Sequence, residues 1–187
     1  MALAPVLAAL LVSAAPGPTA PTPEVRDQVR ALLGSIHGSV PPETFRALGP
    51  GVEEALADFA RGEEFPSRRI RALEALAGLG GDRAEAVHRE VAADRTAPSS
   101  VRRGAVRGLA KLVPPADAPG ALTQLLESDP DPRIRATAAE ALAARAPDGG
   151  CPKVRERVRR EAEPERFGRA LETCDRAAAK QARPPSK

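Results

Sequence analysis

Residues 128–142 read SDPDPRIRATAAEAL, and this stretch decides the fold. Pro132 comes three residues before Arg135, and Ala138, Ala139 and Leu142 follow that arginine by three, four and seven residues. Residues at these spacings lie on one face of an α-helix. Proline suits the first turn of a helix, where its missing N–H has no partner to lose. The stretch therefore predicts a helix that begins near Pro132, directly after an acidic turn.

The same pattern occurs three times along the chain without gaps. RRIRALEAL at residues 68–76 and VRRGAVRGL at 101–109 align with IRATAAEAL at 134–142, so that Arg69, Arg102 and Arg135 are 33 residues apart. Apolar residues at helical spacing between these segments predict partner helices over residues 53–61, 83–93 and 118–127. One such pair is too small to bury its own apolar face, so neighbouring pairs must stack. We expect an all-α solenoid of about four to five antiparallel helix pairs.

The composition supports helices that pack closely. The 187 residues include 38 alanines, 24 arginines and no tryptophan or tyrosine, whereas leucine, valine, isoleucine and phenylalanine together number only 38. Strands favour β-branched and aromatic residues, so a β-sandwich or barrel is disfavoured. Alanine, leucine, arginine and glutamate are good helix formers, and alanine lets neighbouring helices approach closely.

The segment at residues 128–142 closely resembles the HEAT-repeat consensus, in the short variety that is common in bacteria and was first noted in phycobilin lyases. The resemblance covers roughly residues 53–146 and implies an armadillo-like helical superhelix. It also implies that each motif arginine bonds to an acidic residue of a turn and so builds a ladder along the stack. The ladder residues expected from the resemblance are Arg69, Arg102, Arg135, Asp94, Asp129 and Asp131.

The amino terminus resembles a secretory signal. Residues 1–15 read MALAPVLAALLVSAA and carry no charged side chain, and small residues follow the apolar run as a signal peptidase requires. A buried first helix is the alternative. We expect a signal peptide at residues 1–14, a Pro-rich spacer at 15–23, the repeat domain at 24–180 and a disordered tail at 181–187. A periplasmic or secreted location follows, or a cytoplasmic one if the first 15 residues are not a signal.

The two cysteines fall in the last helix pair, the terminal hairpin at residues 151–180. Pro147-Asp148-Gly149-Gly150 predicts a helix break, followed by helices over residues 152–162 and 165–180 with a turn at 163–164. Cys151 and Cys174 then lie at nearly the same height on antiparallel helices. In an exported chain this predicts a disulfide between them; two reduced thiols are the alternative.

Sequence motifs for catalysis are absent. His37 and His88 belong to no catalytic or metal-binding pattern, and we place His37 near a helix end and His88 on a polar helix flank. Gly80-Gly81 ends a helix and is not a phosphate-binding loop. We therefore expect no enzyme activity, no cofactor and no metal.

The charge pattern leaves several partners open. The net charge is +3, and the densest basic run occupies residues 153–160. This run is either a solvated helix face or a patch for an acidic partner. Nucleic-acid binding is disfavoured, because four phenylalanines and no tryptophan or tyrosine offer few platforms for bases.

Together these patterns predict an exported, monomeric, non-catalytic scaffold for a protein partner. Its exposed binding residues are expected on the motif helices, which line the concave side of such stacks by analogy. The candidates are Arg68, Arg71, Arg103, Arg107 and Arg133. An accessory factor for a cofactor-attachment enzyme of the bilin-lyase kind is the second hypothesis, and a DNA-binding protein is the third.

Overall fold

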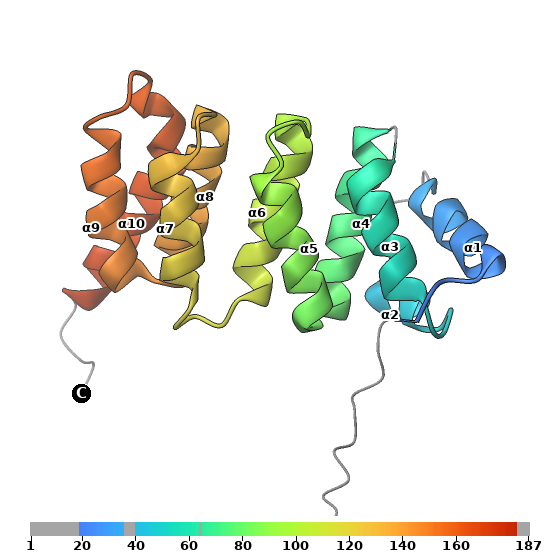
Figure 1. The fold of residues 1–187 in the computed structure, drawn as a ribbon. Coiled ribbons are helices and arrows are strands. Elements are labelled where there is room, and N and C mark those ends of the chain that lie inside the picture. Colours follow the sequence, from blue (N-terminus) through green and yellow to red (C-terminus); the bar gives the residue numbers. More distant parts are fainter. Residues whose placement is uncertain (1–18, 36–39, 64, 183–187) are drawn as a thin grey trace, which may run out of the picture.

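A computed structural model describes residues 19–35, 40–63 and 65–182, and every regular element in these residues is helical (Figure 1). The predicted all-α solenoid is confirmed. The predicted signal peptide lies outside the described residues, as does nearly all of the predicted tail. The helices are α1 (Pro23–Leu33), α2 (Pro42–Arg46), α3 (Val52–Gly62), α4 (Pro66–Leu79), α5 (Gly81–Ala93), α6 (Ser99–Leu112), α7 (Ala118–Ser128), α8 (Pro132–Arg145), α9 (Pro147–Val158) and α10 (Gly168–Gln181), with a short 3-10 helix, η1 (Pro164–Phe167), before α10.

Local chemistry sets the helix starts. Pro66 and Pro132 occupy the first positions of α4 and α8, and Pro98 immediately precedes α6. The carboxylate of Asp131 accepts a hydrogen bond from the backbone N–H of Arg133 at 2.9 Å and caps α8. Proline costs a helix least in its first turn, and aspartate stabilises a helix most at the position just before that turn.

The helices stack as successive pairs, α3–α4, α5–α6, α7–α8 and α9–α10, and α1 with α2 closes the amino-terminal end (Figure 1). We call α3, α5, α7 and α9 the first helices and α4, α6, α8 and α10 the second helices. Consecutive second helices pack extensively against one another along the whole stack. The first helices touch their neighbours less, and α5 and α7 barely meet. The stack is therefore tight on the second-helix side and open between α5 and α7.

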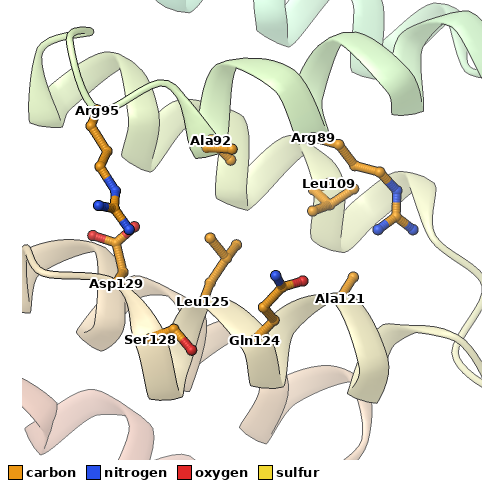
Figure 2. A pocket seen from close by; sticks show the side chains of 10 residues that line it. Arg89, Ala92, Arg95, Leu109, Ala121, Gln124, Leu125, Ser128 and Asp129 are labelled. Carbon is orange, nitrogen blue, oxygen red and sulfur yellow. The ribbon is translucent and has the colours of Figure 1, made fainter.

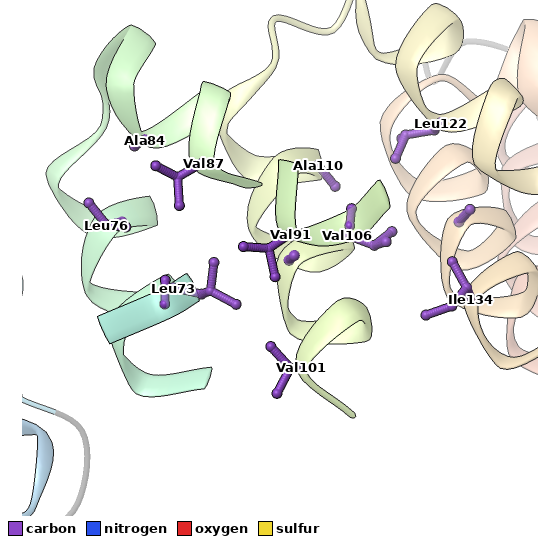
Figure 3. Packing of buried hydrophobic residues seen from close by; sticks show 14 of the residues in the cluster. Leu73, Leu76, Ala84, Val87, Val91, Val101, Val106, Ala110, Leu122 and Ile134 are labelled. Carbon is purple, nitrogen blue, oxygen red and sulfur yellow. The ribbon is translucent and has the colours of Figure 1, made fainter. Parts of the chain in front are cut away.

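The motif positions form the core. Leu76, Leu109 and Leu142 are buried, as their equivalent positions in the repeat predict. The alanines three residues after the motif arginines are also buried, which lets adjacent helices approach closely. Leucine, valine and isoleucine side chains interleave from one pair to the next, and Figure 3 shows Leu73, Val91, Val106 and Ile134 among them. The core is one continuous stripe inside the stack.

The start of the last pair differs from the sequence prediction. Helix α9 begins at Pro147 and runs through the two glycines that were expected to break it, and it ends at Val158 instead of residue 162. The chain breaks instead at Ala146, between α8 and α9. A Cβ at Gly150 would lie 2.7 Å from Cγ of Leu142, so this glycine lets α9 approach α8. It permits close helix packing and does not end a helix.

His88 also differs from its predicted place on a polar helix flank. Its side chain is completely buried, and Nδ1 lies 2.7 Å from the carbonyl oxygen of Ala84. The ring fits because Gly108 on α6 has no side chain, and a Cβ there would stand 2.1 Å from Nε2 of His88. Burial lowers the pKa of His88, since the charged imidazolium would lose its hydration in the core. The histidine is a core residue.

Candidate functional site: two grooves on the helical stack

The ladder predicted from the motif arginines is most complete at Arg102. Its buried guanidinium donates from Nε and Nη2 to the carbonyl oxygen of Ala92 at 3.0 and 2.8 Å. It also forms a buried ion pair with the carboxylate of Asp129, with 3.3 Å between Nη1 and Oδ1. Arg102 thus ties the end of α5 to the turn between α7 and α8. A charge at this depth is tolerated because each of the three guanidinium nitrogens donates to an acceptor and the carboxylate of Asp129 balances the charge.

Arg135 repeats the arrangement one pair later. It donates to the carbonyl oxygen of Asp129 at 2.8 Å and pairs with the carboxylate of Glu161 at 2.6 and 2.5 Å. These hydrogen bonds, with help from Arg157, outweigh the effect of burial and lower the pKa of Glu161. Sequence reasoning missed Glu161. A signal existed, since Glu161 follows Arg135 by nearly the same interval as Asp129 follows Arg102.

The other expected ladder residues have different contacts. Arg69 donates to the carbonyl oxygen of Ala60 at 2.9 Å, but it makes no hydrogen bond to Asp94, whose carboxylate accepts from Thr96. Asp131 binds the hydroxyl of Ser99 and the N–H of Arg133 instead of joining the ladder. Burial alone would raise the pKa of Asp131, but these hydrogen bonds outweigh burial and lower it to about 2.

The terminal hairpin holds the predicted covalent link. Cys151 and Cys174 form a disulfide between α9 and α10, with their Cα atoms 5.5 Å apart. Both residues are buried. The link joins α10 to its partner α9 at the carboxy-terminal end of the described stack.

A groove of about 360 Å³ crosses the second helices, and we call it the second-helix groove. Gly104 on α6 contributes no side chain to its floor, and a Cβ there would lie 3.6 Å from Cγ1 of Ile70. Glu74, Arg107 and Glu140 occupy the same motif position on α4, α6 and α8, so that charge alternates across the groove. Its lining consists of Ile70, Leu73, Glu74, Ala77, Ser100, Gly104, Arg107, Gly108, Ala110, Lys111, Thr137, Glu140 and Ala141.

A second hollow of about 310 Å³ lies on the other side of the stack, where α5 and α7 separate, and we call it the α5–α7 cleft. Figure 2 shows Arg89 at one end and Arg95 at the other, with Leu109 and Leu125 between them. Its lining consists of Arg89, Ala92, Ala93, Arg95, Leu109, Ala121, Gln124, Leu125, Ser128 and Asp129.

Comparison with known families agrees with this geometry. Two overlapping stretches, residues 52–143 and 91–173, match the HEAT-repeat family. The chain belongs to the HEAT-repeat family. The HEAT repeats therefore begin with α3 and extend into α10, beyond the residues that carried the sequence resemblance. The match does not confirm the phycobilin-lyase type, and it supports neither a bilin-lyase nor a DNA-binding role. No curated protein and no solved structure matches the chain.

HEAT repeats are typical of surfaces that bind other proteins, and here several of the predicted binding arginines are used within the stack. Arg71 donates to the carbonyl oxygens of Leu33 and Ser35 at 2.9 and 2.5 Å, and so holds the end of α1. Arg103 donates to the hydroxyl of Thr137 at 3.2 Å and bridges α6 and α8. Both arginines are partly buried and serve the contacts between repeats.

Among the described residues, Arg107 is the one predicted binding arginine without a hydrogen bond, ion pair or ring contact. Arg68 stacks over the ring of Phe65 at 4.9 Å, and Arg133 pairs with Asp131 at 3.1 Å. Arg107 is exposed in the second-helix groove and forms no ion pair within the described part of the chain. It is therefore the arginine best placed to meet a partner.

The basic run at residues 153–160 is largely neutralised within the HEAT repeats. Arg155 pairs with Asp175 at 2.8 Å, and Arg157 pairs with Glu161 at 2.7 Å. Arg160 reaches Glu127 at 3.1 Å. Most of these arginines stabilise contacts between helices, which leaves a weaker positive patch than the sequence suggested.

The residues that the structure describes contain no group of His, Cys, Asp or Glu side chains arranged to hold a metal ion. Among the described helices, none combines the length and the apolar character needed to span a membrane.

Proposed function

We propose that this HEAT-repeat chain is an exported, non-catalytic scaffold that binds a protein partner in the second-helix groove. The observation that carries the proposal is a groove whose apolar floor is bordered by charges with no partner of their own. Glu74, Arg107, Lys111 and Glu140 all line it, and none of them forms an ion pair among the described residues. Elsewhere in the stack, Arg61, Arg83, Arg102 and Arg135 pair with carboxylates of neighbouring helices or turns.

The chemistry of the groove defines the partner. Two carboxylates and two cations balance, so the lining has no net charge and gains little from a purely acidic or purely basic ligand. A segment that inserts an apolar side chain against Ile70 and Leu73, with charges of both signs beside it, complements this surface. At Gly104 a Cβ would make only ordinary contacts with Ile70 and Leu73, so the glycine leaves room for a small apolar group beside them.

The groove continues beyond α4. A neighbouring hollow of about 290 Å³ includes Phe45 and Arg71 and shares Glu74 with the second-helix groove. The two hollows together border α4 on both sides and suit an extended or helical segment more than a compact small molecule. This supports a protein partner over an enzyme substrate.

Export is supported by the disulfide. Bonds of this kind form and persist in oxidising compartments such as the bacterial periplasm, whereas the cytosol keeps thiols reduced. The apolar amino terminus predicted as a signal peptide would direct the chain there. The closed hairpin would in turn stabilise the last repeat outside the cell.

Site-specific crosslinking tests the binding surface. A photo-activated benzophenone residue placed at Arg107 should give one discrete adduct with a protein in the native cell. The same residue at Glu53, which is exposed on the first helix α3, is the matched control. Adducts at position 53 and none at position 107 would contradict the second-helix groove as the binding surface.

Export has its own test. Protein isolated from its native cell should lack the first residues on amino-terminal sequencing. After rapid acid quenching, Cys151 and Cys174 should resist alkylation until a reductant is added. A retained Met1 together with alkylated cysteines would refute export and leave the scaffold proposal standing.

A further inference from the structure

Neighbouring first helices are joined by ion pairs at the amino-terminal part of the stack. Arg61 on α3 binds both carboxylate oxygens of Glu90 on α5, at 2.8 to 3.0 Å. Arg83 on α5 reaches back to Glu54 on α3 at 2.5 to 3.0 Å. Two ion pairs therefore hold α3 against α5, one with its arginine on α3 and the other with its arginine on α5.

The carboxy-terminal part is joined in the same way. The carboxylate of Glu127 on α7 forms ion pairs with Arg160, just after the end of α9, at 3.1 Å and with Arg157 on α9 at 4.0 Å. Lys153 on α9 donates to the hydroxyl of Thr123 on α7. These contacts hold α7 against α9.

Between α5 and α7 there is no such link in the described part of the chain. Helix α7 carries one acid, Glu127, and it faces α9. The carboxylate of Asp129, at the end of α7, forms an ion pair with the buried guanidinium of Arg102. The cations of α5 and its following turn therefore meet no free carboxylate across the α5–α7 cleft.

Two arginines are left at the ends of the cleft. Arg95 points toward Asp129 in Figure 2 but forms no ion pair within the described residues. The Asp129 carboxylate is bonded to Arg102 and to the backbone N–H of Asp131. Arg89 is exposed and, among the described residues, pairs only with Glu85 of its own helix, at 2.7 Å. An exposed pair of this kind is weak and can exchange for another carboxylate.

The floor between the arginines is apolar. Ala92 on α5, Leu109 on α6 and Ala121 and Leu125 on α7 face the hollow (Figure 2). The cleft thus offers an apolar floor with a cation at either end, on the opposite side of the stack from the second-helix groove.

We infer that the α5–α7 cleft binds an acidic segment of a protein partner, whose carboxylates replace the acids that this helix interface lacks. An apolar side chain of the segment lies on the partly exposed Ala121 and Leu125, and carboxylates on either side of it meet Arg89 and Arg95. The partner's acids thereby complete the row of ion pairs that joins the other first helices. This site is separate from the one under the proposed function, so either can fail alone.

Fluorescence anisotropy with labelled peptides tests the inference on the full chain. The probe is a fluorescein-labelled peptide that repeats Glu-Leu-Glu between Gly-Ser spacers, and its counterparts carry Lys or Gln in place of Glu. We expect saturable binding of the Glu peptide, weakened by added salt as ion pairs at a surface are. Neither counterpart should bind measurably.

Matched variants locate the site. Arg89→Gln combined with Arg95→Gln should weaken binding of the Glu peptide by about tenfold, since each lost charge pair removes a few-fold of affinity. Arg107→Gln with Lys111→Gln changes the net charge equally in the other groove and should leave affinity within about twofold. Gln124→Trp fills the cleft without changing charge and should abolish binding, and circular dichroism confirms that each variant is folded.

The remaining outcomes each overturn the inference. Absence of binding by the Glu peptide refutes it, as does equal binding by the Lys peptide. Equal weakening in the two double variants would show that net charge, and not the cleft, attracts the probe. Unchanged binding by the Gln124→Trp variant would place the peptide elsewhere.

Discussion

The contact between Gly108 and His88 gives the sharpest test of how this stack is packed. A Cβ at Gly108 would stand 2.1 Å from Nε2 and 2.2 Å from Cδ2 of His88. The ring has little room to move, since it is completely buried and Nδ1 is held 2.7 Å from the carbonyl oxygen of Ala84. Gly108→Ala must therefore displace the ring or push α6 away from α5.

The size of the effect follows from three contributions. Forcing an extra methyl group into a packed core costs about 1–3 kcal/mol. Displacing the ring sacrifices its hydrogen bond to Ala84, a loss of about 1 kcal/mol. Alanine is better than glycine inside a helix by about 0.5–1 kcal/mol. We expect Gly108→Ala to lower the free energy of unfolding by about 1–3 kcal/mol.

Gly104→Ala is the matched control, one turn earlier on the same helix. A Cβ there would lie 3.6 Å from Cγ1 of Ile70, which is an ordinary van der Waals contact. With no clash to offset the gain in helix propensity, this variant should be more stable than the parent by about 0.5–1 kcal/mol. The two substitutions are chemically identical and should change stability in opposite directions.

Urea denaturation followed by far-ultraviolet circular dichroism measures both variants, because the chain has no tryptophan or tyrosine to report by fluorescence. A double-mutant cycle with His88→Ala adds a check, since removing the ring should relieve most of the loss caused by Gly108→Ala. If Gly108→Ala and Gly104→Ala unfold at the same urea concentration, the packing of α6 on His88 described above is wrong.

The remaining predictions concern charge and crosslinks. Arg102→Ala should cost about 3–5 kcal/mol in urea denaturation because it leaves a buried carboxylate unpaired, whereas the exposed control Arg107→Ala should change stability by less than about 0.5 kcal/mol. Burial lowers the pKa of His88 in the folded chain, so the unfolded chain binds a proton near pH 6.5 that the folded chain does not. Stability should thus fall as the pH drops below about 6.5, and a His88→Leu variant with the same pH dependence as the parent would refute this assignment. Replacing Cys151 and Cys174 by serine should lower the free energy of unfolding by about 2–5 kcal/mol, and thermal melting midpoints equal to those of the parent would contradict a stabilising disulfide.

The repeat could be predicted because its signals lie within single helices. The 33-residue spacing of Arg69, Arg102 and Arg135 fixes which residues share a helix face, and the prolines mark the helix starts. Burial of the motif leucines followed from the same spacing. The matched heights of Cys151 and Cys174 likewise needed only the rise of a helix.

The candidate sites were predicted less completely. Five arginines were equivalent as exposed candidates in the sequence, yet only Arg107 is left without an internal contact in the described residues. Arg71 and Arg103 are used between repeats because their long side chains reach groups that are distant in sequence. The repeat motif did not predict the α5–α7 cleft. The cleft exists because α5 and α7 pack little against each other, and a pattern within one helix does not show this.

The repeat helices, their pairing and the family followed from the periodicity of the sequence, because it specifies which residues share one face of a helix. The distances between the helices depend on tertiary contacts. Gly108 and Gly150 allow close approach at two places, which buries His88 and extends α9 across a predicted break. Glu127 of α7 pairs with Arg160 at the end of α9, and Asp129 pairs with Arg102, so neither carboxylate bridges the cleft to α5. Interhelical distance depends on which side chains meet across an interface, and a pattern confined to one helix does not contain that information.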